Sequence, residues 1–406
     1  MRVAFFGNVC NNQYQVCRAL REHHGIDAHL YINDADHTQM LPESDSPELA
    51  GNYPPWIHRG RYIHGKALLF PRKAEITKEL CRYDAVVVSY LGPIFAGQSG
   101  VPTAFFVSGA DLTVIPFASK HAAMFKGLAR LPKIITSLRQ NQGVRNMDVV
   151  WRMEPFHDHE LEQLGLKERT SSQFFPLIID PLQFRAPDEP DPAVTGILSD
   201  LRERWKFILF HPTRIIIRAT DAMKKKKYWK CNDMLLEGFA KFVHESGVKD
   251  AVLVMPERSA SPDIPLAKQM IHDLDIEDNI YWAQPPRPEG FTRSELLGIY
   301  AESDAVADQF GPSMISMTGV EALCMGKPLI THIVEEKIAQ MYESHPVLNS
   351  DSADRIAENL TMLYRDPAER DRVGRESLEW LDLHHSPIHG GAIWAEGIRG
   401  LAPGIA

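Results

Sequence analysis

The sequence has few cysteines, and none of them are spaced for a zinc site. Among 406 residues the five cysteines are Cys10, Cys17, Cys81, Cys231 and Cys324, and no Cys-x-x-Cys occurs. An odd number of scattered cysteines excludes a disulfide framework and favours reduced thiols. We therefore expect a cytoplasmic location, and we predict no metal site.

Long apolar runs and an excess of positive charge are also missing. No run approaches the roughly 18 residues of a membrane span, and residues 1–10 lack the features of a signal peptide. The formal net charge of −9 argues against a general nucleic-acid-binding protein, which would be basic. No strongly basic amphipathic helix stands near the N-terminus, so peripheral membrane contact is an open alternative without support of its own.

The glycine pattern of a dinucleotide site, G-x-G-x-x-G, is absent, although the unit that usually carries it is present. Residues 2–6 predict a strand, Gly7 and Asn8 a turn, and apolar residues at helical spacing follow. Gly7 and Asn8 would let the backbone approach a donor or acceptor molecule. The alternative is a plain strand-to-helix turn.

The first half of the chain alternates continuous apolar runs with helical patterns. Such runs predict parallel strands that are covered on both faces. Residues 37–76, rich in proline, glycine and tyrosine, predict loops and short helices. The predicted strands are residues 28–32, 84–89, 103–107, 133–137, 148–151 and a run that starts at 174, and residues 157–166 predict a helix.

The second half repeats this pattern after a proline-rich acidic linker at residues 187–192. Its predicted strands are residues 207–210, 251–255, 280–283, 305–307 and 329–331, and its predicted helices are residues 233–243, 294–301, 354–364, 368–381 and 393–398. At this length two cores are expected. We predict an α/β protein with two doubly wound, Rossmann-like domains facing across a cleft, residues 1–190 and 191–380, followed by a segment, residues 381–406.

Residues 304–331 read as strand, loop, helix and strand. Thr318 is the expected N-cap, and Glu321 stands at capping-box spacing from it. Gly326 and Pro328 then end the helix. The N–H groups of Ser316, Met317, Thr318 and Gly319 would lie at a helix N-terminus and could bind an anion. The plain alternative for Glu321 is the capping box alone.

Cationic side chains follow the strand at residues 207–210. Arg214 could fork onto phosphate oxygens, and Lys230 could act as a point charge. For the lysines at 224–227 a solvated basic loop is favoured.

Each of the remaining candidate site residues has two possible roles. Trp282 could stack on a base or pack in the core. Asp111, at a strand end, could orient an acceptor hydroxyl or cap a helix. Glu257 and Arg258 could line the site or form a surface ion pair.

Several of these segments, in this order, resemble those of GT-B glycosyltransferases, nearest to the family-four retaining group. Residues 108–111 resemble its H-G-x-D segment, with serine for histidine, and residues 176–184 its P-N-G-I-D-x-x-x-F signature, without the asparagine and glycine. Arg214 and Lys230 resemble the phosphate clamp. Residues 321–328 resemble E-A-M-A-x-G-x-P, but Ser313 stands where the family's E-x7-E carries its first glutamate.

The resemblance implies a hexosyl transfer from a UDP- or GDP-linked sugar to an acceptor hydroxyl on a sugar or on a lipid- or polymer-linked acceptor. It implies retention, no metal and no further cofactor, ribose binding by Glu321, sugar contacts near Ser313, and a final segment that crosses back to the first domain. The alternatives are a degenerate GT-B protein that serves as a non-catalytic binding subunit, and a GT-B epimerase-type enzyme. The oligomeric state is not predicted.

Overall fold

The computed structural model describes residues 1–37, 40–124, 130–185, 189, 191–218, 230–258, 261–287, 290–311 and 313–403, without the side chains of residues 120–124 and 130. By their internal contacts these residues form two compact units. Unit 1 is Met1–Ile178 with His385–Ala406, and unit 2 is Ile179–His384. The lysines at 224–227 and residues 187, 188 and 190 of the proline-rich linker lie outside the described residues.

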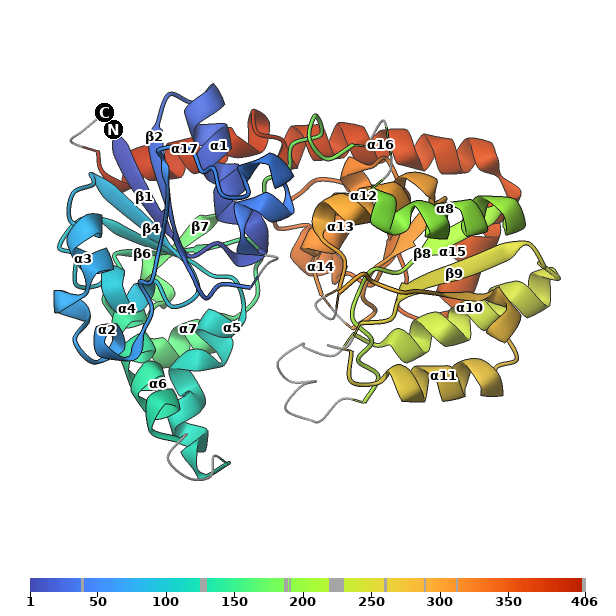
Figure 1. Cartoon of the computed structure of the whole chain (residues 1–406), viewed down its shortest axis with the longest axis horizontal. Helices are drawn as coiled ribbons and strands as arrows, with labels where there is room; N and C mark the ends of the chain where they lie inside the picture. Colours follow the sequence, from blue (N-terminus) through green and yellow to red (C-terminus); the bar gives the residue numbers. More distant parts are fainter. Residues whose placement is uncertain are drawn as a thin grey trace. The chain divides into compact units, whose positions relative to one another are not determined.

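Unit 1 is built on a parallel sheet of seven strands in the order β3-β2-β1-β4-β5-β6-β7 (Figure 1). The strands are β1 (Arg2–Phe6), β2 (Asp27–Asn33), β3 (Ile57–Gly60), β4 (Ala85–Val88), β5 (Thr103–Phe106), β6 (Val149–Arg152) and β7 (Thr170–Phe174). Every pairing between neighbours is parallel, for example Phe6 with Val88. The sheet confirms the doubly wound pattern expected for the first half.

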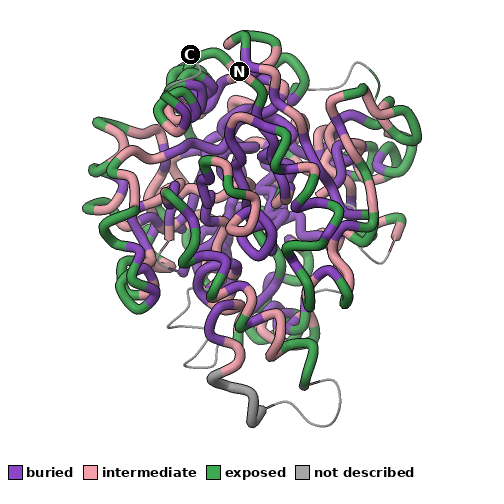
Figure 2. The backbone as a smooth tube through the Cα atoms, turned by 90° about the vertical axis from the view of Figure 1, so that its left-hand side faces the viewer, coloured by how far each residue is buried: buried purple, intermediate pink, exposed green. Residues whose placement is uncertain are grey.

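Helices cover both faces of this sheet. They are α1 (Asn12–His23), α2 (Gly65–Leu69), α3 (Glu75–Leu80), α4 (Pro93–Ala96), α5 (Ala110–Thr113), α6 (Arg130–Arg145), α7 (Asp158–Leu164) and α17 (His389–Leu401). One core joins alternate strand residues such as Phe5 to α1 and to Trp394 of α17. The opposite core joins Phe6 and its neighbours to α3, α4 and α6. The inner strands β1, β2, β4 and β5 are accordingly buried along most of their length, and buried backbone fills the middle of the view in Figure 2.

Unit 2 has a parallel sheet of six strands in the order β10-β9-β8-β11-β12-β13. The strands are β8 (Phe207–Phe210), β9 (Ala251–Pro256), β10 (Ile280–Ala283), β11 (Ala305–Ala307), β12 (Leu329–Thr331) and β13 (Leu348–Asn349). The helices are α8 (Pro192–Arg204), α10 (Asn232–Ser246), α11 (Ile264–Asp273), α12 (Arg293–Glu302), α13 (Met317–Cys324), α14 (Glu335–Ile338), α15 (Ala353–Arg365) and α16 (Pro367–His385). All five strands predicted here are confirmed.

Three predictions in unit 1 are wrong. Residues 133–137 belong to helix α6 and not to a strand. A strand is expected to start at residue 174, but strand β7 ends at that residue. Pro176, two residues later, has no N–H with which to continue the pairing. Residues 37–76 contain, besides short helices, the edge strand β3.

Among the described residues, no helix combines the length and the apolar character needed to cross a membrane.

Candidate functional site

The strand order of unit 2 reverses between β8 and β11. From β8 the chain proceeds outward to β9 and β10, whereas β11, β12 and β13 extend on the other side. Ligands of open α/β sheets bind at the carboxyl ends of the strands beside such a reversal. The residues that follow β8, β9 and β11 are therefore the candidate ligand-binding residues of this unit.

Asp308, directly after β11, joins the loop after β8 to the start of α13. Its buried carboxylate accepts hydrogen bonds from Thr213 Oγ1 at 2.7 Å and from Ser316 Oγ at 2.6 Å. Ser316 is the N-cap of α13, and its hydroxyl oxygen accepts from the Gly319 N–H at 3.4 Å. The expected N-cap at Thr318 is wrong, because Asp308 holds the Ser316 hydroxyl in the capping position two residues earlier.

Met317, Thr318 and Gly319 form the first turn of α13. The first N–H groups of a helix have no partner within it, and its N-terminus attracts anions. Gly319 also has a packing role, since a Cβ there would lie 2.9 Å from Ile315 Cγ2 and 3.0 Å from Leu329 Cδ2. The structure thus places all three at a helix N-terminus, and their contact with a donor stays a prediction.

Glu321, on the same helix, is buried, and Arg293 and Tyr300 are among its partners. Its Oε1 lies 2.7 Å from Arg293 Nε, and its Oε2 accepts from the Tyr300 hydroxyl at 2.9 Å. Burial raises the pKa of Tyr300 well above its ordinary value, so the phenol remains a donor. These contacts orient the carboxylate of Glu321. Its contact with ribose hydroxyls stays a prediction.

Lys230 and Ser313 both form a hydrogen bond with the side-chain amide of Gln309. The ammonium of Lys230 donates to Gln309 Oε1, and Gln309 Nε2 donates to Ser313 Oγ at 2.9 Å. The Ser313 hydroxyl also lies 3.2 Å from the carbonyl oxygens of Met314 and His332. Ser313 is therefore held by neutral groups at the position where the resembled family has a carboxylate.

Arginines stand after β8 and β9. Arg214 is exposed in the loop after β8. Arg258 is half-buried, and its Nε is buried with no hydrogen-bond partner in the described part of the chain. Burial lowers the pKa of Arg258. Gly290 leaves space beside this guanidinium, since a Cβ there would lie 3.4 Å from Arg258 Nε.

The surface ion pair suggested for Glu257 and Arg258 does not form. Glu257 instead contacts Lys268 at 2.7 Å and Gln284 at 2.6 Å. Because an unpaired buried cation is unfavourable, Arg258 is suited to an acceptor that the described protein residues do not supply. An anion or a carbonyl oxygen of a ligand has this chemistry.

His211, directly after β8, joins the end of β11 to the start of α10. Its Nδ1 lies 2.8 Å from the Ala307 carbonyl oxygen, and its Nε2 lies 2.7 Å from Asn232 Nδ2. A carbonyl can only accept, so Nδ1 carries the proton and Nε2 accepts from the amide. Burial lowers the pKa of His211 to about 4, so the ring is neutral at pH 7.

Trp282 lies on the edge strand β10 and is half-buried. It packs against the core of unit 2, and Lys268 Nζ lies 5.2 Å from its ring centroid. The structure therefore gives it a packing role, and stacking on a base stays a prediction. Among the described residues, no three His, Cys, Asp or Glu side chains are grouped so that they could hold a metal ion.

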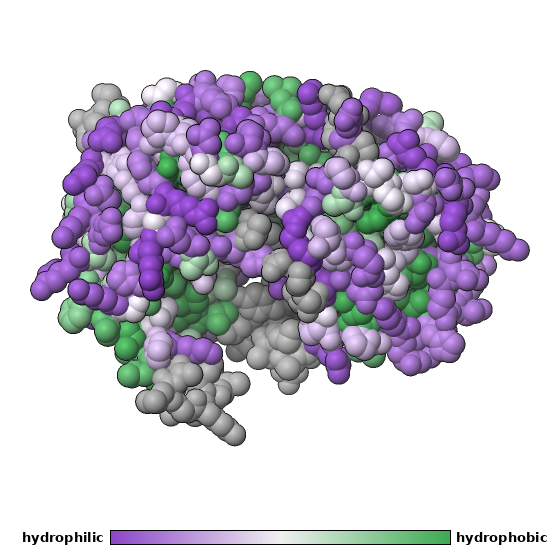
Figure 3. Space-filling view, viewed as in Figure 1, coloured by the Kyte–Doolittle hydropathy of each residue, from purple (hydrophilic) through white to green (hydrophobic). Residues whose placement is uncertain are grey.

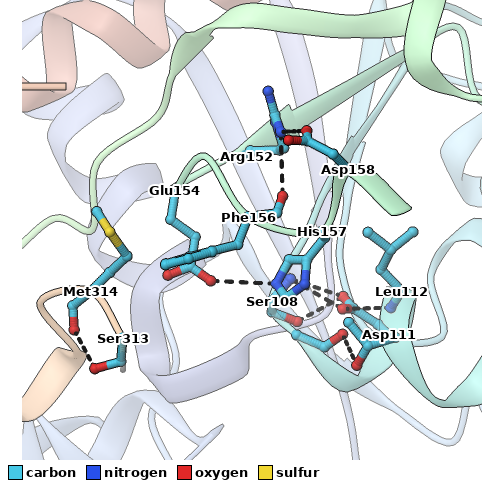
Figure 4. Close-up of polar contacts among 12 residues, drawn as sticks. Ser108, Asp111, Leu112, Arg152, Glu154, Phe156, His157, Asp158, Ser313 and Met314 are labelled. Carbon is cyan, nitrogen blue, oxygen red and sulfur yellow. Dashed lines mark hydrogen bonds and ion pairs between the residues drawn. The ribbon is translucent and has the colours of Figure 1, made fainter. Parts of the chain in front are cut away.

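In unit 1, Asp111 is enclosed by protein donors (Figure 4). Its carboxylate accepts from the N–H groups of Tyr90 at 3.0 Å, Ser108 at 3.1 Å and Leu112 at 3.0 Å, and from Ser108 Oγ at 2.7 Å. Burial raises its pKa. The N-cap of α5 is Gly109, so the capping alternative for Asp111 is wrong. The carboxylate ties the loop after β4 to the loop after β5, and a role toward an acceptor stays a prediction.

Gly7 and Asn8 form the turn after β1. Gly7 has a φ of +96°, and a Cβ on it would lie 2.7 Å from the Ser89 carbonyl oxygen. Asn8 is buried and donates to the side chain of Asn11 at 2.6 Å and to the Met40 carbonyl at 2.7 Å. Both residues are thus required by the local fold, and their contact with a ligand stays a prediction.

The sequence analysis singled out none of His211, Asp308 and Arg293. For two of the three a signal was available. His211 and Asp308 are the first polar residues after the central strands β8 and β11. The pairing of Arg293 with Glu321 joins residues 28 positions apart and has no local signal.

Comparison with known proteins identifies the fold. HepE of Anabaena in complex with UDP matches 98% of this chain and 100% of its own, with a TM-score of 0.66 and 13% identity, and HepE in complex with UDP-glucose matches with a TM-score of 0.63. A glycosyltransferase of Rickettsia africae matches 99% of each chain, with a TM-score of 0.67 and 13% identity. Sucrose-phosphate synthase of Thermosynechococcus elongatus also matches 99% of each chain, with a TM-score of 0.60 and 13% identity.

No protein-family model and no curated protein sequence matches this chain. At 13% identity the structural similarity indicates a shared fold, and this similarity extends over nearly the whole chain. The chain has the GT-B fold of these glycosyltransferases.

Proposed function

We propose that the chain is a glycosyltransferase that moves a hexosyl group from a nucleotide-sugar donor to an acceptor hydroxyl. The observation that carries the proposal is the end of unit 2 at which β8, β9 and β11 terminate. There Arg214, Arg258 and Lys230 stand with the N-terminus of α13 and the oriented carboxylate of Glu321. UDP and UDP-glucose, which HepE binds, have the matching groups: a diphosphate, a ribose diol and a base.

The chemistry of the donor explains these residues. A departing nucleoside diphosphate gains negative charge, which preorganised cations and N–H dipoles stabilise. Arg214, Lys230 and the N–H groups of Met317 and Thr318 would supply them without a metal ion, and Glu321 would accept from the ribose hydroxyls. We propose retention through attack on the leaving-group side, with a donor phosphate oxygen taking the acceptor proton.

The acceptor would be a sugar or a lipid- or polymer-linked sugar. We propose a cytoplasmic location, because the five cysteines are scattered, odd in number and without Cys-x-x-Cys spacing, which suits reduced thiols.

Calorimetry with UDP and GDP tests the donor site. One nucleotide should bind with micromolar affinity, and Arg214→Ala and Lys230→Ala should each weaken that binding by about 10- to 100-fold. Arg375→Ala, which removes an exposed arginine elsewhere in unit 2, is the matched control and should bind as the wild type does. Absence of binding to both nucleotides would contradict the proposal.

A non-catalytic nucleotide-binding protein is the second candidate, and Ser313 favours it. Its hydroxyl is held by Gln309 and two carbonyl oxygens, where the resembled family has a carboxylate. Incubation with the sugar donors of the nucleotide that binds separates the two candidates. Release of the free nucleotide, abolished in Lys230→Ala, supports the enzyme, and the anomeric configuration of the product by NMR tests retention. Tight binding without turnover of any donor supports the second candidate.

A further inference from the structure

One face of unit 1 exposes large apolar side chains beside cations. The described chain has nine exposed large hydrophobic side chains, and four of them lie on or next to α2 and α6: Leu69 at 44%, Phe70 at 57%, Leu131 at 59% and Leu138 at 57% exposed. We call these four, with Arg72, Lys73, Lys133 and Arg139, the α2–α6 face. Hydrophobic residues are visible over this part of unit 1 in the space-filling view (Figure 3).

The members of this face are fixed next to one another. Leu131 and Leu138 are seven residues apart on α6, so they share one side of the helix. Arg139 Nη2 donates to the Leu69 carbonyl oxygen at 2.9 Å and so joins α6 to α2. Phe70, Arg72 and Arg139 line one surface groove. The face is therefore a structured surface and not a set of scattered side chains.

The charge of this face is opposite to that of the protein as a whole. No acidic residue occurs between Asp111 and Asp148, in a chain whose net charge is −9. Within the described residues no ion pair involves Arg72, Lys73 or Arg139. The hydrogen bonds of Arg72 and Arg139 go to neutral groups, namely Gln98, Gln142 and the Leu69 carbonyl oxygen, so their positive charges are not compensated by a carboxylate of the described chain.

We propose that the α2–α6 face binds the surface of an anionic phospholipid bilayer. Leucine and phenylalanine side chains can enter the boundary between headgroups and acyl chains, while the neighbouring cations contact lipid phosphates. Each basic residue near such a surface strengthens binding by about fivefold. An acidic protein partner is less well matched, because three of the four apolar residues are leucines, which are under-represented among the residues that anchor protein interfaces.

Co-sedimentation of the full chain with vesicles tests this proposal. The vesicles are phosphatidylcholine alone, or phosphatidylcholine with about a third phosphatidylglycerol, at low and at high salt. The variants are Arg72→Glu/Lys73→Glu for the charges and Phe70→Ser/Leu138→Ser for the apolar contacts. Lys249→Glu/Arg375→Glu, which changes the net charge equally on exposed residues of unit 2, is the matched control.

We expect binding to the anionic vesicles only, at low salt, with at least a tenfold loss in both face variants and none in the control. No binding to anionic vesicles would overturn the proposal, as would equal losses in the control. Binding to soluble polyglutamate without binding to vesicles would also overturn it, in favour of an acidic protein partner. Because vesicle binding needs no nucleotide, its outcome is independent of the proposed transferase activity.

Discussion

The guanidinium Nε of Arg293 lies 2.7 Å from Oε1 of Glu321, and the two side chains are only 13% and 8% exposed. Arg293 is the first residue of α12, whose N-cap Thr292 forms a capping box with Glu295. The pair therefore joins the start of α12 to the middle of α13. Glu321 is part of the fold as well as a candidate ligand-binding residue, so variants at this position must be analysed for both properties.

Replacement of Glu321 by alanine should lower the free energy of unfolding by about 3–5 kcal/mol, because the buried Arg293 would lose its ion pair with Glu321 and the buried Tyr300 hydroxyl would lose its acceptor. Glu321→Gln should cost less, since its amide oxygen can still accept from Tyr300. Urea unfolding measures both. The double variant Glu321→Ala/Arg293→Met should be more stable than the sum of the single losses predicts. Strict additivity would contradict a coupled pair.

Replacement of Arg258 by methionine should raise stability by about 1–3 kcal/mol while it weakens nucleotide binding. The buried Nε has no hydrogen-bond partner among the described residues, so removal of the guanidinium relieves a desolvation penalty. Urea unfolding and calorimetry with UDP measure the two effects. Arg287→Met is the contrasting control, because it leaves the buried carboxylate of Glu295 without its ion pair and should lower stability. Lower stability of Arg258→Met with unchanged nucleotide affinity would show a purely structural role.

Acid should destabilise the protein partly through His211. Its folded pKa of about 4 lies below the ordinary 6.5, so the unfolded chain binds the proton first as the pH falls. The stabilisation is complete above about pH 6.5 and is lost toward pH 4, and it amounts to about 3 kcal/mol.

Urea unfolding at pH 7 and pH 4.5 checks this contribution. The difference between the two pH values should shrink in His211→Gln. It should not shrink in His272→Gln, an exposed histidine whose pKa is raised by Glu277. Equal pH dependence in wild type and His211→Gln would contradict the buried neutral ring.

Gly7→Ala should destabilise unit 1 more than Gly25→Ala does. Both glycines have a positive φ, which costs an alanine about 1–2 kcal/mol. A Cβ at Gly7 would also lie 2.7 Å from the Ser89 carbonyl oxygen, whereas nothing lies within 4 Å of one at Gly25. The added overpacking should cost about 1–3 kcal/mol more. Similar thermal shifts for the two variants would show that the turn can relax.

The sheets were largely predictable because their strands are covered on both faces and therefore appear as continuous apolar runs. β1, β10, β11 and β12 match their predicted ranges, residue for residue. The run at residues 133–137 has the same composition but folds as part of α6. There Ser137, Gln140 and Val144 recur at helical spacing and are buried, and Gln140 Nε2 donates to the Tyr90 carbonyl at 2.8 Å. Local composition could not distinguish these two outcomes.

The order of apolar runs along the sequence determined the fold class, and the polar residues after the strands indicated where a ligand site would lie. Only the tertiary structure decided how those residues are used. It moved the cap of α13 to Ser316, paired Glu321 with Arg293, enclosed Asp111 in hydrogen bonds, and left the buried Nε of Arg258 without a hydrogen-bond partner in the described chain. The reason is physical: burial and apolar periodicity are repeated along the chain, whereas a hydrogen bond or ion pair between distant residues depends on distances that no local pattern encodes.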